Sequence, residues 1–419
     1  MKSKLLSFCQ VALLVAMPLS MGRALAQQAA NQSPSYSVVN LGTPLGGPFA
    51  LAQTISLEGF VAGYASLPGD MTSHAVLWQP NGFTDLGALG GSNSGILGNL
   101  SGFTETATPD PLNQDFCETG THLVCLAFTL VNGKEVPLST LGGTAAAAFD
   151  NNSSGQVVGQ SLTSAHDPSC LVNGQPAAPS YEMQQAVPAV WQNGTATALP
   201  MFSGDSNGTA NADNDLGQIT GSSGDCSSHP NAHALLWDHG KVTNLGSLGG
   251  AIHNTPAAIN NLGQITGGSD LSGDSIQHAF LWTNGVMHDL GTLPGDSSSY
   301  GSSINNLGQI VGQSCDSNNQ CHAFLWQNGK MTDLNTLIPA NSQLSLYSGA
   351  TIDDLGIVGG YAVDQSTATA PAFVLFPSFG TSAQAPPMEA VPRVAMPESL
   401  RSQIQHGMRA RGARRIGPN

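Results

Sequence analysis

The chain is short of charge, and above all of basic residues. Only 9% of its 419 residues are Asp, Glu, Lys or Arg, whereas about a quarter is usual in soluble proteins. Residues 36–377 hold 25 of the 27 acidic residues but no arginine and only three lysines. The shortage of Lys and Glu argues against helical bundles and coiled coils. The acidic balance argues against nucleic acid as a partner, because this body would repel a phosphate backbone.

Long apolar runs are absent beyond the first 26 residues. Two lysines precede a mostly apolar stretch from Leu5 to Met21, and a small-residue cleavage site ends at Ala26. We expect residues 1–26 to be a signal peptide cleaved near Ala26, and residues 27–35 to be a short linker. A membrane anchor is the alternative, although the stretch is shorter than the ~20 residues that a span needs. The mature chain is expected to be a secreted or periplasmic monomer without a transmembrane segment.

Recognisable catalytic motifs are absent as well. The sequence has no Gly-x-Ser-x-Gly elbow, no His-Glu-x-x-His, no Walker loop and no sialidase-like Asp box. Without arginine in residues 36–377, clamps for carboxylate or phosphate substrates are hard to build. We therefore predict no catalytic residues, and these absences favour binding over catalysis.

Glycine is abundant, with 50 residues, and the chain carries a strong internal repeat. The clearest copies are His278-Ala-Phe-Leu-Trp282 and His322-Ala-Phe-Leu-Trp326, each followed by Asn-Gly and then by Asp-Leu. Related copies begin at positions 74, 126, 187, 233 and 371. Asn-Gly is the preferred two-residue hairpin turn, and Asn-Asn-Leu-Gly marks a second tight turn. Each unit therefore divides into four short strands.

Four strands per unit, repeated around a ring, are typical of a propeller. The first unit, residues 38–63, lacks the opening strand, whereas the last opening strand, residues 371–375, has no unit after it. Joining the two completes one blade and removes exposed strand edges. We predict an all-β, seven-bladed β-propeller over residues 36–377, with the last blade closed by both chain termini. A right-handed β-solenoid is the rival, but it does not explain the complementary ends.

The repeat carries a family resemblance. The pattern His-Ala-Phe-Leu-Trp, Asp-Leu-Gly-Thr-Leu, Ile-Asn and Gly-Gln-Ile-Val-Gly resembles the HAF family of bacterial extracellular repeat proteins. The resemblance covers about residues 36–377, and the units from 233 to 337 match best. The units around 95–130 and 187–217 depart from the pattern. The resemblance implies an exported bacterial repeat protein, but no particular biochemical activity.

Six cysteines remain after removal of the leader, an even number that favours disulfides in an exported chain. All six fall in loops that link the last strand of one unit to the opening strand of the next. Two of these loops hold a pair of cysteines each, whereas two neighbouring loops hold one each. The predicted disulfides are Cys117–Cys125, Cys315–Cys321 and Cys170–Cys226. A free or metal-bound Cys170 is the alternative to the last pair.

Histidine and tryptophan recur at fixed repeat positions. The histidines at 74, 233, 278 and 322 share one position that Leu126, Val187 or Pro371 also fills, so a ring of metal ligands is not expected. We predict hydrogen-bonded structural histidines, and tryptophans that pack blades rather than stack on sugars. The recurring aspartates at 85, 289 and 333 are interpreted as turn residues.

Function is expected where the repeat is interrupted. The longest insertions, residues 107–125 and 162–186, belong to the cysteine-bearing loops and hence to one face of the ring. Their candidate binding residues are Asp115, Glu118, His122, His166, Asp167, Tyr181 and Glu182. Convergent acids suit Ca²⁺, yet no Asp-x-Asp-x-Asp-Gly loop exists, and residues 213–215 are interpreted as a repeat turn. We predict no metal site and no cofactor, with Ca²⁺ as the open alternative.

The sequence thus predicts an exported, non-catalytic module that binds a glycan or a protein through the loops of one propeller face. One alternative is a structural protein of the envelope or cell surface with no discrete ligand. Another is a polysaccharide-acting enzyme that uses loop carboxylates, with His122 or His166 as acid and base. Residues 378–419 are Pro/Ala-rich and then Arg-rich, and disorder is the default for such a tail. Docking of this tail on anionic lipid or on the acidic propeller is the alternative.

Overall fold

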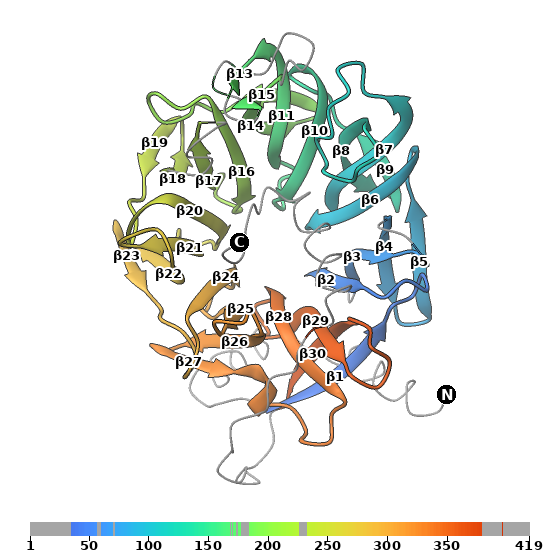
Figure 1. Ribbon diagram of the computed structural model, residues 1–419, viewed down its shortest axis with the longest axis vertical. Coiled ribbons are helices and arrows are strands. Elements are labelled where there is room, and N and C mark those ends of the chain that lie inside the picture. Colours follow the sequence, from blue (N-terminus) through green and yellow to red (C-terminus); the bar gives the residue numbers. More distant parts are fainter. Residues whose placement is uncertain are drawn as a thin grey trace.

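The protein is a ring of seven four-stranded antiparallel sheets around a central channel (Figure 1). The computed structural model describes residues 35–56, 60–69, 72–167, 169, 171–172, 175–176, 184–225, 233–378 and 396. Within these ranges the one helical element is a short 3-10 turn, η2 (Leu334–Thr336). The predicted seven-bladed propeller is confirmed. The predicted leader and almost all of the predicted tail lie outside the described residues.

Six blades are each built from consecutive strands, numbered outward from the channel. Blade 1 contains β2 (Ala50–Ile55), β3 (Val61–Ser66), β4 (Ser73–Gln79) and β5 (Gly82–Gly87). Blade 2 contains β6 (Gly90–Gly98), β7 (Ser101–Pro109), β8 (Leu123–Val131) and β9 (Lys134–Pro137). Blade 3 contains β10 (Gly142–Asn151), β11 (Val157–His166), β14 (Gln184–Gln192) and β15 (Thr195–Ala198), with a small hairpin, β12 (Leu171–Val172) and β13 (Gln175–Pro176), inserted between β11 and β14.

Blades 4 to 6 follow the same plan without inserted strands. Blade 4 contains β16 (Asn207–Asp213), β17 (Ile219–Gly224), β18 (His233–Asp238) and β19 (Lys241–Asn244). Blade 5 contains β20 (Gly249–Ile259), β21 (Ile265–Leu271), β22 (Gln277–Thr283) and β23 (Val286–Asp289). Blade 6 contains β24 (Ser298–Ile304), β25 (Ile310–Cys315), β26 (Cys321–Gln327) and β27 (Lys330–Asp333).

Blade 7 closes the ring with strands from both ends of the propeller. Its three inner strands are β28 (Leu344–Ile352), β29 (Val358–Asp364) and β30 (Ala372–Ser378), and its outermost strand is β1 (Ser35–Gly42). Val38 of β1 lies opposite Leu375 of β30 in an antiparallel ladder. The predicted closure of the ring by both chain ends is confirmed, but the predicted composition of the shared blade was wrong, because β2 and β3 of the first unit belong to blade 1 and only β1 joins blade 7. The His-Ala-Phe-Leu-Trp strand is the third of a blade, so each sequence unit spans the outer half of one blade and the inner half of the next.

Because successive strands of a blade run in opposite directions, the connections between strands lie alternately on two faces of the ring. The turns between first and second strands and between third and fourth strands lie on one face, which we call the turn face. The connections between second and third strands, which carry the cysteines, lie on the opposite face together with the blade-to-blade links. We call this second face the loop face. The two long insertions therefore share one face, as predicted.

The hairpin turns adopt the backbone that their sequence requires. Asn284 and Gly285 have φ of 53° and 84°, and Asn328 and Gly329 have 51° and 78°. Both central residues of a type I′ turn need positive φ, which asparagine and glycine tolerate best. His239 takes the asparagine position in blade 4, with φ of 49°.

The second strand of each blade lies very close to the first at a glycine. A Cβ on Gly312 would lie 1.9 Å from the carbonyl oxygen of Tyr300, and one on Gly267 would lie 2.1 Å from that of Thr255. No side chain fits at such a distance from backbone. The glycine that closes the Gly-Gln-Ile-Val-Gly repeat is therefore required by the close approach of the two inner strands.

The core lies between neighbouring blades. Phe324 of β26 is fully buried against Ala279 and Leu281 of the preceding blade. Trp191 and Trp237 are also buried, and their indole Nε1 atoms donate to the carbonyl oxygens of Ser139 and Pro200 at 2.7 and 2.6 Å. The repeated aromatic residues pack blades together, as predicted. This core fixes the geometry of the channel that the blades surround.

Candidate functional site

On the loop face, the insertion between β7 and β8 is ordered by its own polar groups. The disulfide Cys117–Cys125 closes it. Asp115 accepts hydrogen bonds from the backbone N–H groups of Thr119 at 3.0 Å and Gly120 at 2.9 Å. The Nδ1 atom of His122 lies 2.9 Å from the carbonyl oxygen of Asn113. Two predicted binding residues, Asp115 and His122, thus help to shape the loop in which they lie.

A buried carboxylate lies beneath this insertion. Glu105 of β7 is fully buried and accepts hydrogen bonds from Thr119 and Thr121, the latter at 2.6 Å. It also accepts from the backbone N–H groups of Ser92 and Asn93 at 3.1 and 3.0 Å. Because its partners come from the loop and from strand β6, Glu105 anchors the insertion to the blade.

The second insertion, between β11 and β14, is a neighbour of the first. The Nε2 atom of Gln114 donates to Oε1 of Gln184 at 3.4 Å, which links the two loop regions. His166, at the end of β11, is exposed. Asp167 is fully buried and accepts from Ser169 and from Asn207 of the next blade. The other predicted binding residues of this loop, Tyr181 and Glu182, lie outside the described residues.

Glu118 belongs to the same insertion as Asp115 and His122 and has a φ of 51°. The structure therefore places Asp115, Glu118 and His122 in one loop, with His166 and Asp167 in the adjacent blade. They remain predicted binding residues of the loop face.

Two of the three predicted disulfides are present. Cys117–Cys125 and Cys315–Cys321 each close one loop on the loop face. Cys170 and Cys226 lie outside the described residues, so their pairing stays a prediction.

Three of the four repeated histidines pair with a repeated aspartate on the adjacent outer strand, whereas His233 pairs with Asp205. His74 lies 3.0 Å from Asp85, and His278 lies 2.9 Å from Asp289. The same pair recurs as His322 and Asp333 at 2.7 Å. The structural role predicted for the histidines is confirmed.

The three repeated aspartates of these pairs also hold turns, because each accepts a hydrogen bond from a backbone N–H two residues ahead. The donors are Gly87, Gly291 and Asn335, at 2.8, 2.7 and 2.9 Å. This aspartate position therefore has two structural roles: it pairs with a histidine, and it holds a turn.

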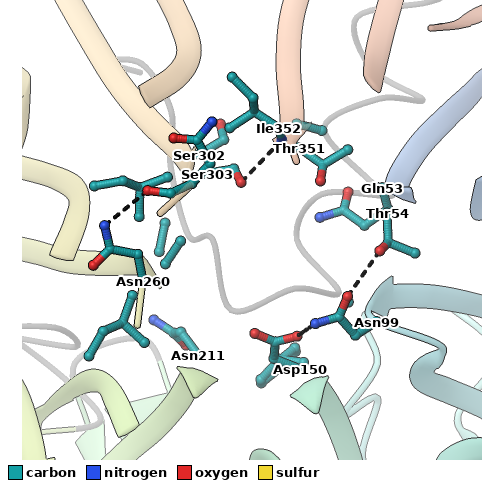
Figure 2. Close-up of a pocket in the computed structure, with 18 of the residues that line it drawn as sticks. Gln53, Thr54, Asn99, Asp150, Asn211, Asn260, Ser302, Ser303, Thr351 and Ile352 are labelled. Atoms are coloured by element: carbon teal, nitrogen blue, oxygen red, sulfur yellow. Dashed lines mark hydrogen bonds between the residues drawn. The ribbon is translucent and has the colours of Figure 1, made fainter. Parts of the chain in front are cut away.

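The central channel holds a cavity of about 630 Å³ that reaches the turn face. Apolar residues such as Leu97 and Ile259 line its wall together with carboxamide and hydroxyl side chains (Figure 2). The polar residues include Gln53, Thr54, Asn99, Asn151, Asn211, Asn261, Ser302 and Thr351. No Lys, Arg or His is among the described residues of the lining. A volume of this size is ordinary for a small-molecule site.

Asparagine turns at the rim of this cavity connect successive blades. Asn260 is 4% exposed, and its Nδ2 donates to the carbonyl oxygen of Asn305 at 2.9 Å. Asn305 donates in the same way to Asp353, and Asn214 to Asn260, both at 2.9 Å. Asn152 donates to Asn214 at 3.0 Å. One repeated side chain thus links blades 3 to 7 in series.

Blades 1 and 2 continue this series with different residues. Thr54 donates to Oδ1 of Asn99 at 3.2 Å, and Nδ2 of Asn99 donates to Oδ1 of Asp150 at 3.0 Å (Figure 2). Hydrogen bonds therefore run around the rim from blade 1 to blade 7. At the end of the series, Asp353 replaces asparagine and has no side-chain N–H to donate to a further blade.

Burial changes the acidity of carboxyl groups on this rim. Burial raises the pKa of Asp213 well above its ordinary value, and the neighbouring charge of Asp150 raises it further. Burial also raises the pKa of Asp150, against hydrogen bonds from Asn151 and Asn99. Hydrogen bonds from Ser153 hold the pKa of Asp215 below its usual value. Carboxyl groups with raised and with lowered pKa values thus lie near one another on one wall of the channel.

Sequence reasoning missed the cavity. None of the candidate residues that the structure describes on the loop face lines it. The interpretation of residues 213–215 as a turn was correct, but their position on the channel wall was not foreseen. The sequence did contain a signal. The position just before the inner turn holds Asp213 in one unit, but isoleucine in three others (Ile259, Ile304 and Ile352).

In the part of the chain that the structure describes, no three His, Cys, Asp or Glu side chains are grouped so as to hold a metal ion. The described residues likewise include no helix of the length and apolarity that crossing a membrane requires.

Comparison with known proteins yields likeness at the level of structure alone. No protein-family model matches the chain, and no curated protein sequence matches it. The propeller domain of the Trilobed protease from Pyrococcus furiosus matches at 12% identity and a TM-score of 0.43, over 67% of this chain and 79% of that chain. TolB from Acinetobacter baumannii matches at 13% identity and a TM-score of 0.36, over 81% of this chain and 89% of that one.

A puromycin-hydrolyzing peptidase from Mycobacterium tuberculosis matches at 10% identity and a TM-score of 0.46, over 81% of this chain. The match covers 56% of that peptidase, so the chain spans little more than half its length. At these identities and scores the likenesses carry no argument about what this chain binds or does.

Proposed function

We propose that this protein is an exported, non-catalytic binding module whose ligand is a neutral glycan held at the turn-face end of the central channel. The observation that carries the proposal is the wall of the 630 Å³ cavity, which combines carboxamides, hydroxyls and carboxyls without a described basic residue. The location differs from the one that the sequence predicted, because this cavity has a defined shape and the loop-face carboxylate Asp115 holds its own loop.

The chemistry of the wall suits a polyhydroxylated ligand. Carboxamides such as Gln53 and Asn211 both donate and accept hydrogen bonds, and hydroxyls such as Ser302 do the same. A sugar presents donors and acceptors in equal measure. Phosphate or carboxylate ligands need cationic partners, and the described lining offers no Lys, Arg or His.

Export is supported by the disulfides Cys117–Cys125 and Cys315–Cys321, since such bonds persist in oxidising compartments. The leader predicted over residues 1–26 points the same way. We also propose membership of the HAF repeat proteins, supported by the repeat pattern from 233 to 337.

The test is titration calorimetry of the full chain with neutral oligosaccharides, and with an acidic oligosaccharide as the charge control. Two matched serine variants assign the site. Ser302→Trp fills the channel cavity, whereas Ser164→Trp adds the same bulk at an exposed position of β11 on the loop face. We expect neutral sugars to bind, Ser302→Trp to abolish binding, and Ser164→Trp to leave it unchanged.

The opposite pattern, loss in Ser164→Trp alone, would move the site to the loop face. Release of reducing ends from the same oligosaccharides would replace the binding module by an enzyme. Absence of binding to every sugar would refute the glycan proposal.

A further inference from the structure

Asp213 stands where other blades bury isoleucine. The residue that precedes the inner turn is Ile55 in blade 1 and Ile259, Ile304 and Ile352 in blades 5 to 7. Asp213 is 6% exposed, lines the channel cavity, and has no hydrogen-bond partner for either carboxylate oxygen. A buried carboxylate stays charged in a protein when it has a partner. Asp213 would therefore be stabilised by a cation that donates hydrogen bonds to it.

The neighbouring blade adds a second carboxylate to the same wall. Asp150 of β10 interacts electrostatically with Asp213 of β16. In addition, the buried side-chain oxygen of Asn151 has no hydrogen-bond partner. Two carboxyl groups from adjacent blades therefore interact on this wall, and the residue after Asp150 has a buried side-chain oxygen without a partner. This arrangement suits a cation that donates several hydrogen bonds.

The propeller itself has no cation for this site. Its three lysines, Lys134, Lys241 and Lys330, each begin an outermost strand, and all three are exposed. Residues 36–377 contain no arginine, whereas residues 378–419 contain six. Once the leader is removed, the basic tail is the remaining source of cations within this chain.

One described residue of the tail packs on the propeller. Met396 is 5% exposed and packs in a cluster with Phe49, Tyr64 and Tyr347. The same cluster includes Leu51 and Tyr361, which also line the channel cavity. Met396 therefore fixes the start of the segment 397–419 at a cluster that also contributes to the cavity wall.

The remaining tail is long enough to reach the acids. Arg401 follows Met396 by five residues, which span up to about 17 Å when extended, and Arg409 follows by thirteen. The inner strands β10 and β16 are at most ten residues long, so the channel wall is on the order of 20–30 Å deep. Arg409, thirteen residues beyond Met396, can therefore meet the wall of blades 3 and 4.

We infer that the C-terminal segment 397–419 docks in the central channel and places an arginine guanidinium on Asp150 and Asp213. The planar guanidinium offers a fork of N–H donors that matches a carboxylate pair, and the Asn151 oxygen is a further acceptor. The docked tail fills the cavity that we assign to the glycan, so sugar and tail compete. The tail site itself does not depend on the glycan assignment.

An arginine-specific protease tests this docking on the full chain, because the propeller contains no arginine to cut. Cleavage rates after Arg401, Arg409, Arg411, Arg414 and Arg415 are followed by intact-protein mass spectrometry. We expect at least one site to be cut at least tenfold more slowly than in the free synthetic peptide 397–419. The double variant Asp150→Asn/Asp213→Asn should remove this protection.

Two further variants separate docking from loss of folding or of charge. Met396→Ser leaves the propeller residues intact and should also remove the protection. Asp289→Asn removes one negative charge at the outer rim, where the residue is 42% exposed, and should leave protection unchanged. Equal cleavage of wild type and free peptide would overturn the inference. Protection that survives the Asp150→Asn/Asp213→Asn change would also overturn it, since the guanidinium site would not be what holds the tail.

Discussion

Replacing Asn260 by alanine tests the asparagine series at the rim of the channel. Its side chain makes four hydrogen bonds: Nδ2 donates to Gln264 at 2.8 Å and to the carbonyl oxygen of Asn305 at 2.9 Å, and Oδ1 accepts from the N–H groups of Leu262 and Gln264 at 3.0 and 2.9 Å. Alanine leaves these partners unsatisfied in a buried turn.

The size of the effect follows from the number of bonds. Each hydrogen bond contributes about 0.5–1.5 kcal/mol net, so Asn260→Ala should cost about 3–4 kcal/mol. In a domain of this size that lowers the Tm by on the order of 5–10 °C. Asn261 is the matched control, since its side chain makes two solvent-exposed bonds, both to Asp215. Asn261→Ala should cost about 1 kcal/mol.

Thermal unfolding followed by circular dichroism compares the two variants with wild type. Asn260→Asp should fall between them, because it keeps the acceptor and loses both donated bonds. If Asn260→Ala and Asn261→Ala lowered the Tm equally, the claim that this series joins the blades would be refuted.

Three further predictions concern the same framework. Gly312→Ala should cost at least about 3 kcal/mol or prevent folding, because its Cβ would lie 1.9 Å from the carbonyl oxygen of Tyr300; an unchanged Tm would contradict this. Cys315→Ser/Cys321→Ser opens a short loop and should cost about 2 kcal/mol in the chain-entropy account, measured as a fall in Tm without reductant; an unchanged Tm would contradict this. Burial raises the pKa of Asp353 to about 6, with a smaller contribution from the charge of Asp354. The folded state therefore binds this proton more tightly than the unfolded state, and wild type should lose stability as the pH rises from about 4 through 6. Asp353→Asn should lack that loss and exceed wild type by on the order of 2 kcal/mol at pH 7, with the difference vanishing near pH 4; parallel Tm profiles would refute the reasoning.

The sequence was sufficient for the blades because their signals are local. Asn284-Gly285 and Asn328-Gly329 fix hairpin turns by backbone conformation alone, and the His-Ala-Phe-Leu-Trp run marks a buried strand. The complementary ends predicted the pairing of β1 with β30. The phase of the blades could not be predicted, because a cyclic repeat of four strands divides equally well at any strand. Which of the four strands lies nearest the channel depends on packing between blades, and no single repeat unit specifies it.

The site was harder to predict than the fold. Residues that line the channel come from inner strands about a hundred or more positions apart, such as Gln53, Asp150 and Ser302. Each is unremarkable within its own unit. The loop-face acids were easier to notice because they lie in insertions, but whether an acid such as Asp115 faces a ligand or its own loop depends on backbone geometry. Comparison of the repeats position by position does single out Asp213, and the same comparison will find buried substitutions in other propellers.

Thermal unfolding of the full chain with and without a neutral oligosaccharide, in wild type and in Ser302→Trp, tests the central claim most directly. A ligand at a hundred times its Kd adds about 2.7 kcal/mol to stability, a shift of several degrees in Tm. The account predicts this shift in wild type and none in Ser302→Trp, whose added bulk fills the channel cavity. An equal shift in both proteins would place the ligand outside the channel and contradict the account.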